Sequence, residues 1–195
     1  MKESIKMIAV LTLICGMFSV TLASLKETTE SRIEEQVLTY VQGPAISKVL
    51  TGYDNSPVKD RMKFTIPGSS RKITVFPALQ NGRLRGLAIE TFAKGYGGDV
   101  GVMVGFNVGR ESLSGIGITT MKETPGVGAK VARHGFTSQF KEHSYSVELS
   151  AKGGSIDGIS GATISSTATV EAVKQAIEIF KKIKPQIKAA WQLES

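Results

Sequence analysis

Apolar residues are arranged along this chain in three successive patterns. Residues 7–25 form an unbroken apolar run of 19 residues that contains no charged side chain. Between residues 71 and 121, short apolar runs alternate with turn residues, which is typical of β-hairpins. After residue 163 the apolar side chains recur with helical spacing, at Val173, Ala176, Ile177, Phe180 and Ile183. Together these patterns predict an α+β fold, with antiparallel hairpins packed against a few helices.

The first apolar run is long enough to span a membrane. About 20 residues of α-helix are needed to cross a hydrocarbon layer of about 30 Å. Lys2 and Lys6 precede the run, so we expect the short N-terminus to stay in the cytoplasm and the main domain to be exported. The alternative is a cleaved signal peptide, with Thr21 and Ala23 as small residues before Ser24. The length of the run favours a single retained transmembrane helix.

Two hairpins are predicted after the membrane segment. Asn81-Gly82 separates two strand-like runs, and this dipeptide is a strong signal for a tight hairpin turn. The runs 100–108 and 113–121 flank a second turn. A short helix is predicted from Ala129 to Phe140, and residues 144–150 read as a brief strand or a loop.

Glycine and proline set the predicted helix ends. Residues 24–42 are predicted to form a juxtamembrane helix that ends at Gly43-Pro44, and the long helix from Ile164 is predicted to end near Ile183, before Pro185. The expected organisation is a membrane anchor, a juxtamembrane helix with a connecting segment, a folded domain and a tail, at residues 1–25, 26–70, 71–185 and 186–195.

Composition narrows the possible functions. The formal net charge is +7, but the basic residues are scattered and few aromatic residues lie among them, so we predict no nucleic-acid binding. Cys15 is the single cysteine and lies inside the apolar run, which excludes disulfides, iron–sulfur clusters and cysteine-based zinc sites within this chain.

Several catalytic patterns fail when they are tested against the sequence. The stretch 158–162 resembles the hydrolase pattern G-x-S-x-G, but its last residue is Ala162. The stretch 126–130 lacks the Gly-Lys-Ser/Thr of a phosphate-binding P-loop. His134 and His143 are the two histidines, and no cluster supplies three or four metal ligands, so we predict no metal site.

The most unusual segment is DGISGATISS, residues 157–166, at the start of the long helix. The first N–H groups of a helix lack intrahelical partners and lie at the positive end of its dipole, so they favour a bound anion such as phosphate. Ser165 and Ser166 could add hydroxyl donors, and Gly161 keeps side-chain bulk away. The alternative is an ordinary N-cap made by one hydroxyl.

The same segment matches the pattern D-x-x-(S/T)-G-A-T-x-(S/T), which marks FMN-binding domains that a dedicated flavin transferase modifies. Upstream, GYGGDVGVMVGFN and ETPGVGAK follow in the order found in that family. The sequence resembles the G subunit of the Rnf ion-translocating electron-transport complex, and it is similar to the C subunit of the sodium-pumping NADH:quinone reductase.

The resemblance assigns roles to particular residues. It implies that Thr163 carries FMN through a phosphodiester bond, with a recognition motif around it and a loop that lies along the flavin. In this sequence those further residues are Asp157, Ser160, Gly161, Ala162 and Ser165 in the motif, and Glu123, Thr124, Gly126 and Tyr96 along the flavin. Val127 stands where the family commonly has leucine, which preserves an apolar wall.

The function that the resemblance implies is electron relay through covalently bound FMN. The complex would couple ferredoxin and NAD redox chemistry to Na⁺ or H⁺ transport. The implied partners are the other proteins of the complex, one of which is a second covalently flavinylated membrane protein. The flavin transferase and membrane lipid are two further implied partners. Two alternatives stay open: a non-enzymatic assembly or binding module with an empty anion site, and a stand-alone exported flavin reductase.

Overall fold

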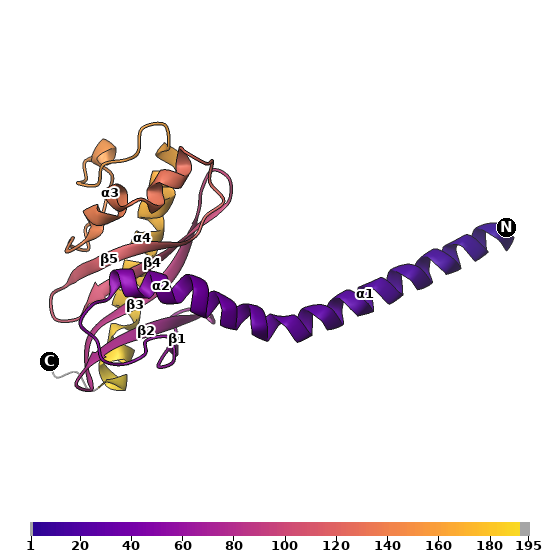
Figure 1. Cartoon of the computed structure of the whole chain (residues 1–195), viewed down its shortest axis with the longest axis horizontal. Coiled ribbons are helices and arrows are strands. Elements are labelled where there is room, and N and C mark those ends of the chain that lie inside the picture. Colours follow the sequence, from indigo (N-terminus) through magenta and orange to yellow (C-terminus); the bar gives the residue numbers. More distant parts are fainter. Residues whose placement is uncertain (1, 192–195) are drawn as a thin grey trace. The chain divides into compact units, whose positions relative to one another are not determined.

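The computed structural model describes residues 2–191. These residues divide into two compact units, with the boundary between Tyr40 and Val41. The first unit is helical: α1 runs from Lys2 to Val37 (Figure 1). The helical stretch Lys2–Val49 contains a window of mean hydropathy 2.2, so it is long and apolar enough to cross a membrane. The predicted membrane-length helix is therefore present in the structure.

The prediction that the helix ends at Gly43-Pro44 was wrong. A π-helical turn, Leu38–Gln42, follows α1 and leads directly into α2, Gly43–Val49. Pro44 lies in the first turn of α2, where a missing N–H removes no intrahelical hydrogen bond. The helix therefore does not end before Gly43-Pro44. It widens locally into a π-helical turn and then continues as α2.

The second unit is built on a five-stranded antiparallel sheet. Its strands follow one another in the order β1-β2-β3-β4-β5, each pairing with the next along the chain. Asn81 and Gly82 have φ of 51° and 73°, which confirms the predicted tight turn between β2 and β3. The strand bounds are Met62–Thr65, Lys72–Gln80, Arg83–Lys94, Asp99–Asn107 and Ser112–Thr120. The predicted α+β class is confirmed.

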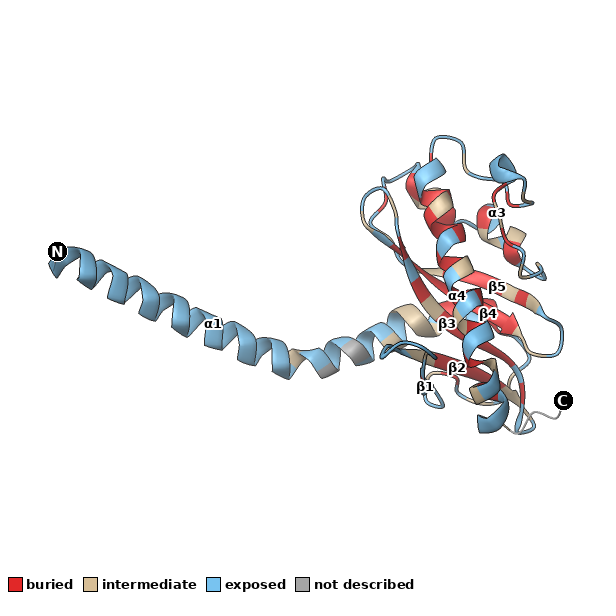
Figure 2. Cartoon of the chain, turned by 180° about the vertical axis from the view of Figure 1, so that it is seen from behind, coloured by how far each residue is buried: buried red, intermediate tan, exposed pale blue. Residues whose placement is uncertain are grey.

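One face of the sheet is covered by α4, Thr163–Ala190 (Figure 2). The apolar stripe predicted from Val173 to Ile183 is buried against β3 and β4. Phe180 stacks on Phe106 of β4 with 4.6 Å between ring centroids, and Thr91 of β3 donates a hydrogen bond to the Ala172 carbonyl at 2.7 Å. These contacts fix α4, and therefore its first turn, relative to the sheet.

Glycines on β4 and β5 let α2 approach the opposite face closely. A Cβ added at Gly105 would come within 2.8 Å of the Val49 carbonyl oxygen. At Gly117 it would lie 3.4 Å from the Ala45 carbonyl oxygen. The sheet is therefore enclosed between α2 and α4, with small residues on the α2 side.

The long helix does not end at Pro185, in contrast to the prediction. Pro185 lies inside α4, which continues to Ala190. Proline removes one backbone hydrogen bond, but the turns beyond it are held by tertiary contacts. Ile187 is 1% exposed, the Gln186 side-chain amide donates to the Thr65 carbonyl at 3.0 Å, and the Trp191 and Phe64 rings lie 5.7 Å apart.

The segment between β5 and α4 is made of short turns. Instead of one helix from Ala129 to Phe140, the structure has 3₁₀ turns at Gly128–Ala132 and Ser138–Phe140 around the four-residue helix α3, His134–Thr137. Gly135 weakens any longer helix here. Another 3₁₀ turn, Ser150–Lys152, and a bridge between Leu149 and Ile156 lead the chain back to the start of α4.

Candidate functional site

The first turn of α4 has no side-chain cap. Ala162 occupies the N-cap position with φ −127° and ψ 42°, and no side chain caps the helix there. The preceding Gly161 has φ 76°, a conformation that favours glycine. The leading N–H groups of α4 are therefore available to a ligand at the positive end of the helix dipole.

The four hydroxyl residues around this helix start have different surroundings. Ser165 donates a hydrogen bond to Glu123 Oε2 at 2.5 Å, and Ser166 Oγ accepts one from the Ile159 N–H at 3.0 Å. These two serines are 2% and 0% exposed and already take part in hydrogen bonds within the protein, so their donation to a bound anion stays a prediction. Thr163 and Ser160 are exposed. Thr163 is the exposed hydroxyl in the first turn itself.

Glu123 joins three segments of the chain. One carboxyl oxygen accepts from Ser165 on α4, and the other accepts from the Gly97 N–H at 3.2 Å. Glycines allow this approach: a Cβ at Gly128 would lie 2.9 Å from Glu123 Cβ, and one at Gly95 would overlap the carboxyl group. Both oxygens of this buried side chain are thus used within the protein, and Glu123 positions the loops around Thr163.

Two hollows meet at Thr163 and Ile164. The first has a volume of about 370 Å³, and the second, on the other side of the helix start, about 440 Å³. The first hollow brings together most of the predicted site residues: Thr163, Gly161, Ala162, Ser165, Glu123, Thr124 and Tyr96. Asp157, Ser160 and Gly126 do not line it, whereas Val127, Gly128 and Ile164 do.

Exposed apolar side chains gather around this point. Within residues 41–191, the exposed large apolar residues are Met62, Phe92, Tyr96, Val127 and Ile164. All of them except Met62 line one of the two hollows, and Ile164 lines both. Because a soluble surface seldom concentrates its exposed apolar residues in one place, the cluster indicates a ligand or partner surface.

Residues outside the motif hold the segment that leads into it. The Gln139 amide accepts from the Asp157 N–H at 2.7 Å and donates to the Asp157 carbonyl at 3.2 Å. Lys174 of α4 forms an ion pair with Glu148, and this hydrogen bond lowers the pKa of Glu148. The two hydrogen bonds with Gln139 fix the backbone of Asp157, while its own side chain is exposed.

Sequence reasoning missed Ile164, Phe92 and Gln139 as parts of the site. Ile164 is the variable position of the motif, and its exposure on a helix that is otherwise buried on one face was the available signal. Phe92 lies on β3 and Gln139 in a 3₁₀ turn, so only the fold brings them to the helix start. Among the described residues, no group of three or more His, Cys, Asp or Glu could hold a metal ion.

Ser165→Ala tests whether the bond to Glu123 holds the site together. The variant leaves a buried carboxyl oxygen without its donor, so we expect a loss of about 1–3 kcal/mol in the free energy of unfolding. Ser160→Ala removes an exposed hydroxyl of the same motif and is expected to change it by less than about 0.5 kcal/mol. Urea unfolding of both variants gives the comparison, and equal stabilities would contradict the assigned role of Ser165.

The start of α4 lies inside a segment of the chain that is similar to a known domain family. Residues 95–178 match the FMN-binding domain family, a range that includes Glu123, Thr163 and the whole motif between them. The predicted resemblance to the G subunit of the ion-translocating complexes is confirmed by the sequence comparison, and the structure comparison shows that the C subunit of the Na⁺-translocating reductase shares the fold.

The curated relatives are G subunits of ion-translocating oxidoreductase complexes. The protein from Shewanella piezotolerans is 33% identical over 132 residues, covering 63% of this chain and 62% of the relative. The Aliivibrio fischeri protein is 32% identical over 123 residues, covering 58% of each chain. The Haemophilus influenzae protein is 36% identical over 115 residues, covering 54% of this chain and 55% of the relative. The match thus spans less than two thirds of each relative.

Solved structures show the same fold. NqrC of Shewanella oneidensis aligns with a TM-score of 0.53 at 18% identity, covering 74% of this chain and 72% of that one. The C subunit of the Na⁺-translocating NADH-quinone reductase of Parabacteroides distasonis aligns with a TM-score of 0.50 at 24% identity, covering 57% and 62%.

Proposed function

We propose that this chain is a membrane-anchored flavoprotein that holds FMN covalently on Thr163 and relays electrons as one subunit of an ion-translocating oxidoreductase complex. The observation that carries the proposal is the first turn of α4. There the exposed Thr163 hydroxyl lies beside uncapped backbone amides, and exposed apolar side chains line the hollows around it. The names of the relatives support the kind of complex.

The residues present fit FMN. The free amides at the start of α4 suit its phosphate, because they combine N–H donors with the positive end of the dipole. Tyr96, Val127 and Ile164 offer an exposed apolar wall for a flat ring system. The hollow of about 370 Å³ lies within the range of about 300–1,000 Å³ that small-molecule sites usually occupy.

Covalent attachment would join Thr163 Oγ1 to the FMN phosphate. The condensation releases the equivalent of one water, and the resulting phosphodiester keeps one negative charge beside the helix amides. Both carboxyl oxygens of Glu123 already accept hydrogen bonds, one from Ser165 and one from the Gly97 N–H, so Glu123 is not placed to take a proton from Thr163. This supports dependence on a separate flavin transferase. Bound FMN would supply the electron transfer, and the chain supplies position and electrostatics.

The wider role follows from the resemblance. The proposed partners are the other proteins of the complex, one of which carries a second covalent flavin. The proposed redox couple is ferredoxin and NAD, and the transported ion is Na⁺ or H⁺. Lys2 and Lys6 before the membrane helix support a cytoplasmic N-terminus, with the domain on the opposite side.

Acid precipitation tests the attachment directly. The full chain is produced with and without a flavin transferase, precipitated with trichloroacetic acid, and the flavin absorbance of pellet and supernatant is measured. We expect flavin in the pellet only when the transferase is present. Flavin that appears entirely in the supernatant would refute covalent attachment, and a colourless protein from the transferase-containing host would favour an assembly module.

A further inference from the structure

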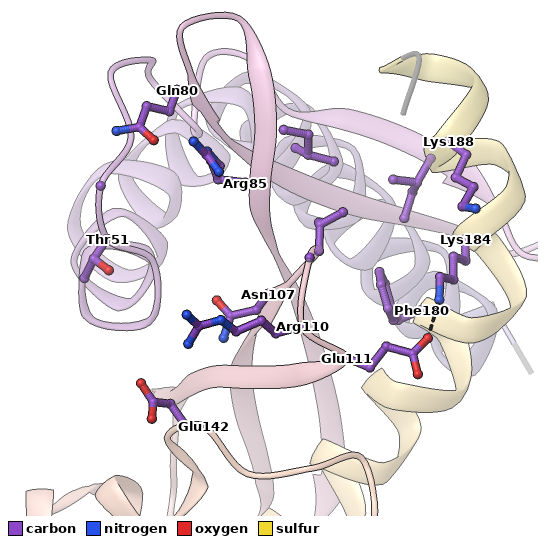
Figure 3. Close-up of a pocket in the computed structure, with 15 residues that line it drawn as sticks. Thr51, Gln80, Arg85, Asn107, Arg110, Glu111, Glu142, Phe180, Lys184 and Lys188 are labelled. Atoms are coloured by element: carbon purple, nitrogen blue, oxygen red, sulfur yellow. Dashed lines mark hydrogen bonds and ion pairs between the residues drawn. The ribbon is translucent and has the colours of Figure 1, made fainter. Parts of the chain in front are cut away.

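A second site lies at the other end of α4, in a cavity of about 790 Å³ (Figure 3). It is formed where the last turns of α4 meet the β4–β5 turn and the beginning of β3. Lys184 of this cavity is separated from Thr163 by about 30 Å along the helix axis, at about 1.5 Å per residue. The cavity is therefore distinct from the proposed flavin site.

The cavity carries an excess of positive charge. Arg85, Arg110, Lys184 and Lys188 line it, together with two carboxylates. Glu111 pairs with Lys184 at 2.7 Å, and this bond lowers the pKa of Glu111, so the two charges cancel. For the other three cations, the part of the chain that the structure describes contains no carboxylate within 4.0 Å. With Glu142 counted, two positive charges remain unbalanced.

Backbone irregularities bring the two arginines to the cavity. The pairing of β2 with β3 shifts between Ala78 and Leu79, so that Arg85 is the extra residue of a β-bulge. Bulges often redirect a side chain next to a binding site. Arg110 lies in the turn between β4 and β5, and the Val108 N–H donates to the Arg85 carbonyl at 3.1 Å, which ties the turn to the bulge. Figure 3 shows both arginines on the sheet side of the cavity.

The helix side of the cavity depends on the continuation of α4 past Pro185. Ile187 and Phe180 are 1% and 3% exposed, so they fix this part of the helix against the sheet. Lys188 follows the anchored Ile187 and extends beside Lys184 in Figure 3. The cavity therefore carries two groups of cations, Lys184 and Lys188 on the helix and Arg85 and Arg110 on the sheet side, above an apolar base that is already packed.

We propose that this cavity binds an organic phosphate. Guanidinium groups pair with phosphate and carboxylate alike, but a carboxylate presents two oxygens in one plane. A phosphate presents oxygens in a tetrahedron and can accept from both Arg85 and Arg110, while Lys188 adds positive charge on the helix side of the cavity. Since about 790 Å³ is within the range for small-molecule sites, the phosphate carries an organic group rather than binding alone.

Two sources share this chemistry. One is a phospholipid headgroup, a ligand that suits a chain with a helix long and apolar enough to cross a membrane. The other is a soluble phosphate monoester. The proposal does not depend on the flavin, because the cavity and the hollow at Thr163 share no lining residue.

The test compares two triple variants of the full chain in detergent. Arg85→Gln/Arg110→Gln/Lys188→Gln removes three cations that line the cavity. Lys59→Gln/Arg71→Gln/Lys72→Gln removes the same charge from exposed positions elsewhere. The probes are glycerol 3-phosphate and citrate, by calorimetry, and phosphatidylglycerol against phosphatidylcholine, by native mass spectrometry. Arg110→Gln alone, at an exposed position in the β4–β5 turn, serves if the cavity triple variant does not fold.

We expect saturable binding of glycerol 3-phosphate or phosphatidylglycerol that weakens about tenfold or more in the cavity triple and stays unchanged in the control triple. Binding of phosphatidylglycerol alone assigns the lipid source, and binding of glycerol 3-phosphate assigns the soluble one. Equal weakening in both triples, citrate binding as tight as phosphate binding, or no saturable binding of any probe would overturn the proposal.

Discussion

Replacing Thr163 by alanine is expected to remove covalent flavin completely. After denaturing electrophoresis, the wild-type band from a host that contains the transferase should fluoresce under ultraviolet light, and the Thr163→Ala band should be dark. The reason is chemical: Thr163 carries the exposed hydroxyl in the first turn of α4, whereas Ser165 and Ser166 are buried and already hydrogen-bonded.

The variant should lose its flavin without losing its fold. The Thr163 side chain is exposed and caps nothing, so its removal is expected to change the free energy of unfolding by less than about 0.5 kcal/mol. Thr163→Ser keeps a hydroxyl at the same place and should fluoresce. Fluorescence that survives in Thr163→Ala would place the attachment point at another residue.

Gly97→Ala is expected to have the second largest effect, because it forces apart the loops that enclose Thr163. A Cβ at Gly97 would overlap the Lys122 carbonyl oxygen, which is backbone and cannot rotate away. The loops must separate, and the hydrogen bond from the Gly97 N–H to Glu123 is lost. We expect a loss of about 1–3 kcal/mol in the free energy of unfolding, measured by urea titration, together with weaker flavin incorporation.

Its neighbour supplies a matched control. A Cβ at Gly98 would lie 3.1 Å from Lys122 Cβ, so a shift of a few tenths of an ångström is enough to accommodate it, in contrast to the overlap at Gly97. Gly98→Ala should therefore unfold at nearly the same urea concentration as the wild type and fluoresce as strongly. If the two variants behave alike, the close packing of the loop against Lys122 does not shape the site.

Local patterns predicted the elements of this fold well. Asn81-Gly82 determines its hairpin turn through positive φ at both residues, and the stripe from Val173 to Ile183 is the buried face of α4. The ends of the helices were less predictable. Whether Pro185 ends a helix depends on distant contacts, here those of Ile187 with the core and of Gln186 with β1. No local signal encodes them.

The site was predictable in part, for a similar reason. The motif around Thr163 is contiguous in sequence, so its residues were found together. The hydrogen bond between Ser165 and Glu123 joins residues that are 42 positions apart in the sequence. It indicates that Ser165 supports the loops around Thr163, a role that the motif alone did not predict. Phe92 reaches the helix start only because β3 lies beneath α4.

The most direct test of the central claim is the intact mass of the wild-type chain purified from a cell that makes the transferase, followed by fragmentation of the peptide that contains the motif. A mass above that of the polypeptide by FMN less one water, located on Thr163, is the result we predict. A chain that has the bare polypeptide mass while it is fully functional in its membrane would contradict the account.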